Sequence, residues 1–143
     1  LMTQYALKLQ SDDFPVSVLC HDFCISPLKD TTQLFDAAYM LDVLEHIPRD
    51  LEFQFFANLK QCLYPNAKII IGIPSAESQI YASPGSKAGH VNCKTKEELH
   101  GTLSRIFTNV FCFSMNDEVV HTGFNRMSNY LFAVCTYAPP HQS

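Results

Sequence analysis

Apolar residues along this chain gather in short runs that alternate with stretches of helical spacing. Five runs are typical of β-strands, because they are rich in β-branched and aromatic residues and are bounded by turn residues. They are residues 16–23 (VSVLCHDF), 35–41 (FDAAYML), 68–74 (KIIIGIP), 109–115 (NVFCFSM) and 129–137 (NYLFAVCTY). The run at 35–41 has no polar face, which indicates a buried parallel strand.

Three segments carry apolar residues at the spacing of an amphipathic helix: 2–10, 48–63 and 95 to about 106. The last of these opens on Thr95 with Glu98 three residues on, the capping box of a helix N-terminus. Residues 64–67 (YPNA) predict a turn between the second helix and the third strand.

Strands that alternate with helices predict one α/β domain over residues 1–143, a three-layer sandwich with a mainly parallel sheet. We expect the last strand, 129–137, to pair antiparallel with 109–115, because a connection of this kind suits a hairpin.

Polar groups follow the first three predicted strands. Asp22 ends one strand, a cluster containing Asp42 and His46 follows the next, and residues 75–81 follow the third. The carboxyl ends of parallel strands meet at one edge of a sheet, where ligands of such folds bind. The polar loop 75–94 is long for a compact domain, which favours a functional or locally structured segment.

The composition is that of an ordinary globular domain with a formal net charge of −4. Its basic residues are scattered, so we expect neither a nucleic-acid partner nor an acidic membrane surface. No apolar run approaches the ~20 residues of a membrane span, and polar residues interrupt the N-terminus where a signal peptide would be apolar. These features favour a cytoplasmic protein.

The six cysteines stand mostly inside apolar runs, as reduced core residues do. A metal site of Cys20, Cys24, His90 and Cys93 is disfavoured, because zinc sites usually have tighter loop knuckles and one cysteine would lie inside a strand. We therefore expect no metal site.

The segment FDAAYMLDVLEHIPRDLEFQFFANLKQCLYPNAKIIIGIPS resembles the central block of class I S-adenosylmethionine-dependent methyltransferases of the small-molecule type. GHVNCKTKEEL is similar to the segment that precedes the last helix of that family. The resemblance extends over about residues 14 to 137, and residues 64–67 replace the usual turn glycines. It implies a Rossmann-like methyltransferase fold, S-adenosylmethionine as cofactor and a small or polar acceptor molecule.

The resemblance also implies roles for individual residues. Asp22 and Phe23 would lie beside the adenine ring, and the segment Tyr39, Met40, Leu41 and Asp42 would pass the methionyl part of the cofactor. The chemistry of its own side chain, and not the resemblance, makes His46 a candidate general base for a hydroxyl acceptor, since an imidazole titrates near neutral pH. A structural role for Glu45 and His46 at the strand–helix junction is an equal alternative. His90 is a rival base, and His121 a weaker one.

The glycine-rich turn of the family has no counterpart here, since none of the five glycines forms G-x-G. The chain therefore corresponds to the C-terminal two-thirds of the family domain, N-terminally incomplete. We expect one of three outcomes: a homodimer formed by domain swapping or through the sheet edge left open, a rearranged and narrower sheet, or a fragment of a longer methyltransferase that is inactive by itself. The alternative function is a non-catalytic α/β module used for association.

Overall fold

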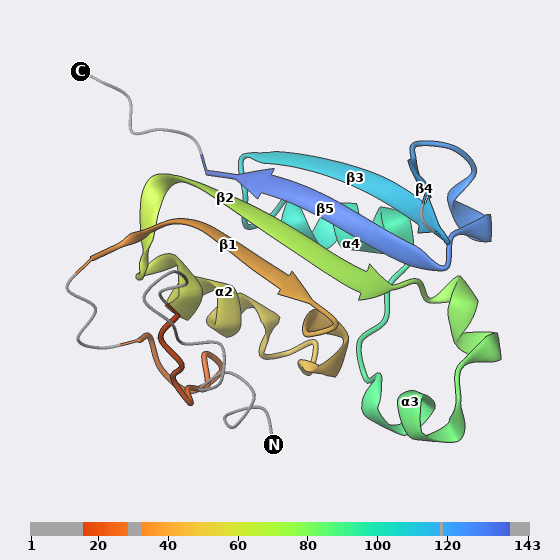
Figure 1. Cartoon of the computed structure of the whole chain (residues 1–143), viewed down its shortest axis with the longest axis horizontal. Helices are drawn as coiled ribbons and strands as arrows, with labels where there is room; N and C mark the ends of the chain where they lie inside the picture. The colour runs from red at the N-terminus through yellow and green to blue at the C-terminus, as the bar shows by residue number, and fades with distance from the viewer. Residues whose placement is uncertain (1–15, 29–32, 118, 138–143) are drawn as a thin grey trace.

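A computed structural model describes residues 16–28, 33–117 and 119–137. It contains one five-stranded mixed sheet in the order β1-β2-β5-β3-β4 (Figure 1). The strands are β1 (Phe35–Leu41), β2 (Leu63–Pro74), β3 (Asn109–Asn116), β4 (Val119–His121) and β5 (Tyr130–Thr136). The predicted α/β class is confirmed, and so are four of the five predicted strands.

The sheet is parallel between β1 and β2 and antiparallel in its other ladders, so the described strands form a mixed sheet and not the mainly parallel one that was expected. The predicted pairing of the last strand with β3 is confirmed, with Val110 opposite Cys135. On its other side β5 pairs antiparallel with β2, so the last strand is inserted between two strands that precede it in the chain.

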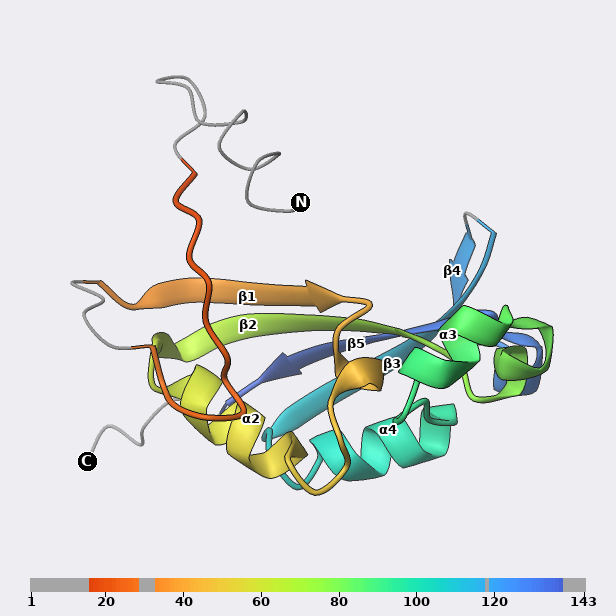
Figure 2. The ribbon, with the colours of Figure 1, turned by 90° about the horizontal axis from the view of Figure 1, so that it is seen from below.

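Two helices, α2 (Glu52–Lys60) and α4 (Lys96–Leu103), cover one face of the sheet (Figure 2). Two of the three predicted layers thus lie within the described residues. The shorter elements are η1 (Leu44–His46), η2 (Glu77–Tyr81), α3 (Pro84–Gly89) and η3 (Asn125–Met127). The predicted helix at 2–10 lies outside the described residues.

The core lies between the sheet and the two helices. Alternate residues of the central strands point into it, and Ile69, Ile71, Leu131 and Ala133 are fully buried. The helices contribute apolar side chains at the predicted spacing, including Phe56 from α2 and Leu99 from α4. This alternation fixes which side chains of β1 face the core and which face outward.

The opposite face of the sheet carries an open apolar row. Tyr39, Ile70, Val134 and Phe111 are cross-strand neighbours on four adjacent strands. Tyr39 is 78% exposed and Phe111 is 61% exposed. The prediction that 35–41 is buried on both faces is therefore wrong, because β1 is an edge strand and no described helix covers this side.

Residues 16–23 do not form the predicted strand; they follow an irregular path beside the sheet and α2 (Figure 2). A strand requires a partner that satisfies its backbone hydrogen bonds, and no described strand pairs with this segment. Residues 64–67, predicted as a turn, are included in β2, where the register shifts between Phe35↔Leu63 and Ala37↔Lys68. The sequence signal there marks an irregularity of the strand.

The long loop 75–94 is locally structured, with η2 and α3 inside it. It ends at the predicted capping box, which is confirmed: Thr95 Oγ1 accepts from the Glu98 backbone N–H, and the Glu98 carboxylate accepts from the Thr95 backbone N–H. The cap fixes where α4 begins and so where the loop returns to the sheet.

Candidate active site

A pocket of about 480 Å³ lies beside β1 and reaches the carboxyl end of that strand, and α2 forms another of its sides. This volume is in the range of small-molecule sites. Three parts of the chain form its wall: His21 to Cys24, β1 with the residues that follow it, and Phe55 with Leu59 of α2. Of the predicted site residues, the wall contains Asp22, Phe23, Tyr39, Met40, Asp42 and His46.

The segment around Phe23 is attached to α2 instead of to a neighbouring strand. Asn58, buried on α2, donates its side-chain N–H to the Phe23 carbonyl at 2.7 Å. The Phe23 ring packs edge-on against Phe55, with centroids 5.9 Å apart, and against His21 at 4.7 Å. These contacts bring residues 21–24 to the pocket without strand pairing.

Asp22 lies in a turn. Its carboxylate oxygen Oδ1 accepts from the Cys24 backbone N–H at 2.8 Å, and its carbonyl accepts from the N–H of Ile25 at 3.1 Å. Side chains of this type commonly form such turns. The carboxylate is exposed at the pocket wall, and one of its oxygens orders the turn.

Asp42 is held at the end of β1 by a residue of β5. The Tyr130 hydroxyl donates to Asp42 Oδ1 at 2.9 Å and accepts from the Asp42 backbone N–H at 3.2 Å. Asp42 has a φ of 54°, in the left-handed region. Burial raises the pKa of Tyr130 above its ordinary value, and the hydrogen bond to Asp42 adds to this shift.

Gly72 of β2 makes this contact between β1 and β5 sterically feasible. A Cβ atom at Gly72 would lie 2.7 Å from Tyr130 Cε1 and 2.7 Å from Leu41 Cδ2. The tyrosine ring therefore crosses β2 over a residue without a side chain. Leu41 packs here and lies outside the pocket wall, unlike the other predicted cofactor-binding residues.

His46 and His90 are close together. Their ring centroids are 5.1 Å apart, and only His46 lines the pocket. His46 Nδ1 lies 2.8 Å from the Gly89 carbonyl, and His90 Nδ1 lies 2.8 Å from Gln79 Oε1. The weaker base, His121, lies in β4 with its Nδ1 accepting from the Gly123 backbone N–H, outside this wall.

Glu45, another of the polar residues that follow β1, is fully buried beside His46. Its Oε1 lies 3.8 Å from His46 Nε2, and neither carboxylate oxygen has a hydrogen-bond partner among the described residues. Burial raises the pKa of Glu45, and the Asp42 charge adds to this. Ligand atoms of Glu45, His46 and His90 all lie within 4.8 Å of one another, so this group could hold a metal ion.

Cys20, Cys24, His90 and Cys93, the metal ligands considered from the sequence, do not gather as a group among the described residues. Cys24 instead lines the pocket wall opposite β1. Cys93 lies in the loop beyond His90, where burial raises its thiol pKa to about 11, with the Glu45 charge as the next contribution.

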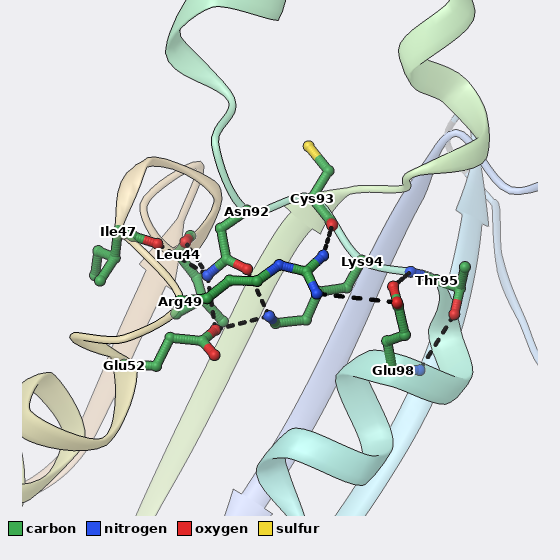
Figure 3. A network of polar contacts seen from close by, with 9 residues as sticks. All are labelled: Leu44, Ile47, Arg49, Glu52, Asn92, Cys93, Lys94, Thr95 and Glu98. Atoms are coloured by element: carbon green, nitrogen blue, oxygen red, sulfur yellow. Dashed lines mark hydrogen bonds and ion pairs between the residues drawn. The ribbon is translucent and has the colours of Figure 1, made fainter.

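A buried polar network fixes the loop 75–94 against η1 (Figure 3). Asn92 donates its side-chain N–H to the Ile47 carbonyl and to the Glu52 carboxylate, and its backbone N–H donates to the Glu45 carbonyl. Lys94 is 2% exposed and lies 2.8 Å from Glu52 Oε1. Buried charges are tolerated when they are paired in this way, so the network sets the position of Glu45 and His46.

No family model and no curated protein matches this chain. Several solved structures are similar to it. The small RNA methyltransferase HEN1 superposes with a TM-score of 0.58 at 15% identity over 78% of this chain. The DhpI–SAH complex gives 0.55 at 16% identity over 83%, and the methyltransferase domain of bacterial CtHen1-C gives 0.57 at 17% over 73%.

The chain therefore has the fold of class I S-adenosylmethionine-dependent methyltransferases, as the resemblance implied. It spans 15% of the HEN1 chain and 53% of each of the other two. One of these neighbours is named for RNA, so the comparisons give no support to the expectation that nucleic acid is excluded as a partner. None of the helices in the described ranges has the length and apolar character that a bilayer crossing requires.

Proposed function

We propose that the protein transfers a methyl group from S-adenosylmethionine to a small polar acceptor, and that this chain forms one wall of the cofactor site. The observation that carries the proposal is the pocket itself. Five of the six residues that the family resemblance assigned to the cofactor line one pocket of about 480 Å³, although they come from two separate segments of the chain.

The chemistry asks little of the protein beyond positioning. A lone pair of the acceptor attacks the methyl carbon, the carbon–sulfur bond breaks, and its electron pair returns to sulfur, which neutralises the sulfonium. A hydroxyl acceptor must also lose a proton. His46 is suited to accept it, because its Nδ1 is engaged by the Gly89 carbonyl and its Nε2 is left with a lone pair near the pocket.

The acceptor class follows from charge. The net charge of −4 and the carboxylates of Asp22 and Asp42 at the pocket disfavour a polyanionic substrate. The glycine-rich turn that would cover the other side of the cofactor is not encoded in this sequence. We therefore expect weaker cofactor binding by this chain than by a protein that carries such a turn.

Calorimetric titration with S-adenosylhomocysteine tests the proposal. We expect saturable binding that Asp42→Asn and Asp22→Ala each weaken at least 5-fold. Asp36→Asn is the matched control, because Asp36 lies on β1 but outside the pocket wall. Equal effects of all three variants, or no heat at millimolar ligand, would count against the cofactor site. Methylation of RNA but not of polar metabolites by the protein would replace the acceptor assignment.

A second function, association through the sheet edge, is favoured by one observation. β1 is one of the two edge strands of the described sheet, and no described strand pairs with its free side. An unpaired edge accepts a strand from another chain. We propose a homodimer through β1, which light scattering would detect as a mass of two chains. Ala37→Lys, at an exposed position of β1, should return it to one chain; a single-chain mass at all concentrations would exclude it.

A further inference from the structure

Three side chains with available lone pairs converge next to the proposed cofactor pocket. Glu45 and His46 belong to η1, and His90 follows α3 in the loop that packs over η1. Their ligand atoms all lie within 4.8 Å of one another. Ligand atoms that are each bonded to one metal ion at about 2.1 Å lie about 3 to 4 Å from one another. Small rotations of the three side chains would therefore bring their ligand atoms to bonding distance of a single ion.

The hydrogen bonds of the two histidines fix how their rings are protonated. A carbonyl oxygen only accepts, so the contacts to the Gly89 carbonyl and to Gln79 Oε1 require a proton on each Nδ1. In neutral rings each Nε2 is then unprotonated and has a lone pair that can bind a metal ion. Metal-binding histidines are oriented in this way, with the second nitrogen donating to a carbonyl or carboxylate.

Glu45 supplies the independent sign of a missing ligand. It is 0% exposed, and both of its carboxylate oxygens lack hydrogen-bond partners among the described residues. The described cations nearby are engaged elsewhere: Lys94 pairs with Glu52, and Arg49 contacts Glu98 and the Cys93 carbonyl. Burying an unpaired carboxylate is costly, and a cation bound between Glu45 and the two histidines would remove that cost.

We infer that Glu45, His46 and His90 bind one divalent transition-metal ion. Two imidazole nitrogens and one carboxylate suit Zn²⁺, Mn²⁺, Fe²⁺ or Co²⁺, whereas Mg²⁺ and Ca²⁺ prefer oxygen ligands throughout. Three protein ligands leave coordination positions open for water or substrate. This inference departs from the expectation of no metal site that was drawn from the sequence. The sequence alone does not show that the loop 75–94 packs on η1 and so brings His90 to Glu45 and His46.

The position of the site gives the ion a use, and this part rests on the proposed function. His46 belongs both to the metal group and to the pocket wall, so an ion there would lie next to the methyl acceptor. A hydroxyl bound to the ion would lose its proton to solvent water more readily than a free hydroxyl. His46 Nε2 would then be a ligand and not the general base, and Glu45 would be paired in the ground state.

Metal titration of the full chain, freed of metal with a chelator, tests the inference without any methyl transfer. Co²⁺ is the first probe, because His-ligated Co²⁺ absorbs visible light; Zn²⁺ and Mn²⁺ follow by calorimetry. We expect one equivalent bound with a dissociation constant in the micromolar range. Glu45→Gln, His46→Asn and His90→Asn should each weaken binding at least 10-fold and change the Co²⁺ spectrum.

Two comparisons keep the test decisive. His90→Asn changes a partly exposed loop residue, so it remains informative if Glu45→Gln fails to fold. His100→Asn on α4 is the control and should bind like the original chain. Binding that survives all three substitutions, or no binding below millimolar metal, would overturn the inference. Metal binding without S-adenosylhomocysteine binding would overturn the proposed function alone, and the reverse result would overturn the metal site alone.

Discussion

The Tyr130 hydroxyl donates a 2.9 Å hydrogen bond to the Asp42 carboxylate, although the two residues are 88 positions apart in the chain. Tyr130 begins β5 and Asp42 follows β1, with β2 between them. The contact therefore ties the last strand of the fold to the pocket wall. It also holds Asp42 in a left-handed backbone conformation, which is uncommon for residues other than glycine.

Tyr130→Phe should lower the free energy of unfolding by about 1 to 2 kcal/mol, because the Asp42 carboxylate loses its donor. Urea denaturation measures this change. Asp42→Asn in the same background should be non-additive, with a coupling of at least about 0.5 kcal/mol. Tyr64→Phe, at an exposed position of β2, is the control. Additive single and double variants would mean that the two residues do not interact.

Gly72→Ala should disturb the contact between Tyr130 and Asp42 by pushing on the tyrosine ring. The added methyl group would lie 2.7 Å from the Tyr130 ring, which is fixed at its hydroxyl, so the ring must move. We expect a loss of about 1 to 3 kcal/mol. The loss should shrink when Tyr130 is replaced by a small residue. Gly101→Ala tests the background, because nothing lies within 4 Å of a Cβ atom there.

The Lys94–Glu52 pair predicts a large effect of a single substitution. Lys94→Met leaves the Glu52 carboxylate buried without its cation, which should cost about 3 to 5 kcal/mol in urea denaturation. The double variant Lys94→Met/Glu52→Leu should recover much of this loss. Lys87→Met, at an exposed position of α3, should be within about 0.5 kcal/mol of the original chain. Equal effects of the two lysine substitutions would argue against a buried ion pair.

Buried thiols and phenols predict alkaline destabilisation. Burial raises the pKa of Cys135 to about 12 and that of Tyr137 to about 12. Above about pH 9 the unfolded chain releases the Cys135 proton while the folded chain keeps it, so the free energy of unfolding falls as pH rises towards 12. The slope is at most about 1.4 kcal/mol per pH unit for each group.

Cys135→Ala should flatten this pH dependence between pH 9 and 11 in urea denaturation. Val134→Ala is the control, because it truncates the neighbouring side chain of β5 and removes no titrating group. Parallel pH profiles for Cys135→Ala and the original chain would show that Cys135 does not contribute.

Local sequence signals predicted most of the helices and strands of the sheet layer. The capping box at Thr95 and the apolar runs at 35–41, 68–74 and 109–115 appear as a helix start and as strands. Residues 16–23 carried an equally clear strand pattern but formed none, because a strand depends on a neighbour and not only on its own residues. Propensity cannot supply that partner.

The candidate site was predictable only in part, for a related reason. Asp22 and Asp42 were recognised because they follow apolar runs. The roles of Glu45, Lys94 and Tyr130 depend on contacts between distant segments, and a charged residue in a polar stretch is ordinarily read as exposed. The contact of Tyr130 with Asp42 has one local sequence signal, which is Gly72 within an apolar strand. A glycine in such a place indicates that another group approaches the backbone closely.

The central claim is that S-adenosylhomocysteine binds beside β1 and not in the larger cavity of about 640 Å³ between α4 and β3. Amide chemical shifts of the isotope-labelled chain, recorded during titration with this ligand, test it most directly. We predict that the signals of Phe23, Tyr39 and His46 move with one saturation curve, while those of His100, Gly101 and Thr122 stay fixed. Shifts confined to the second group, or no shifts at millimolar ligand, would contradict the account.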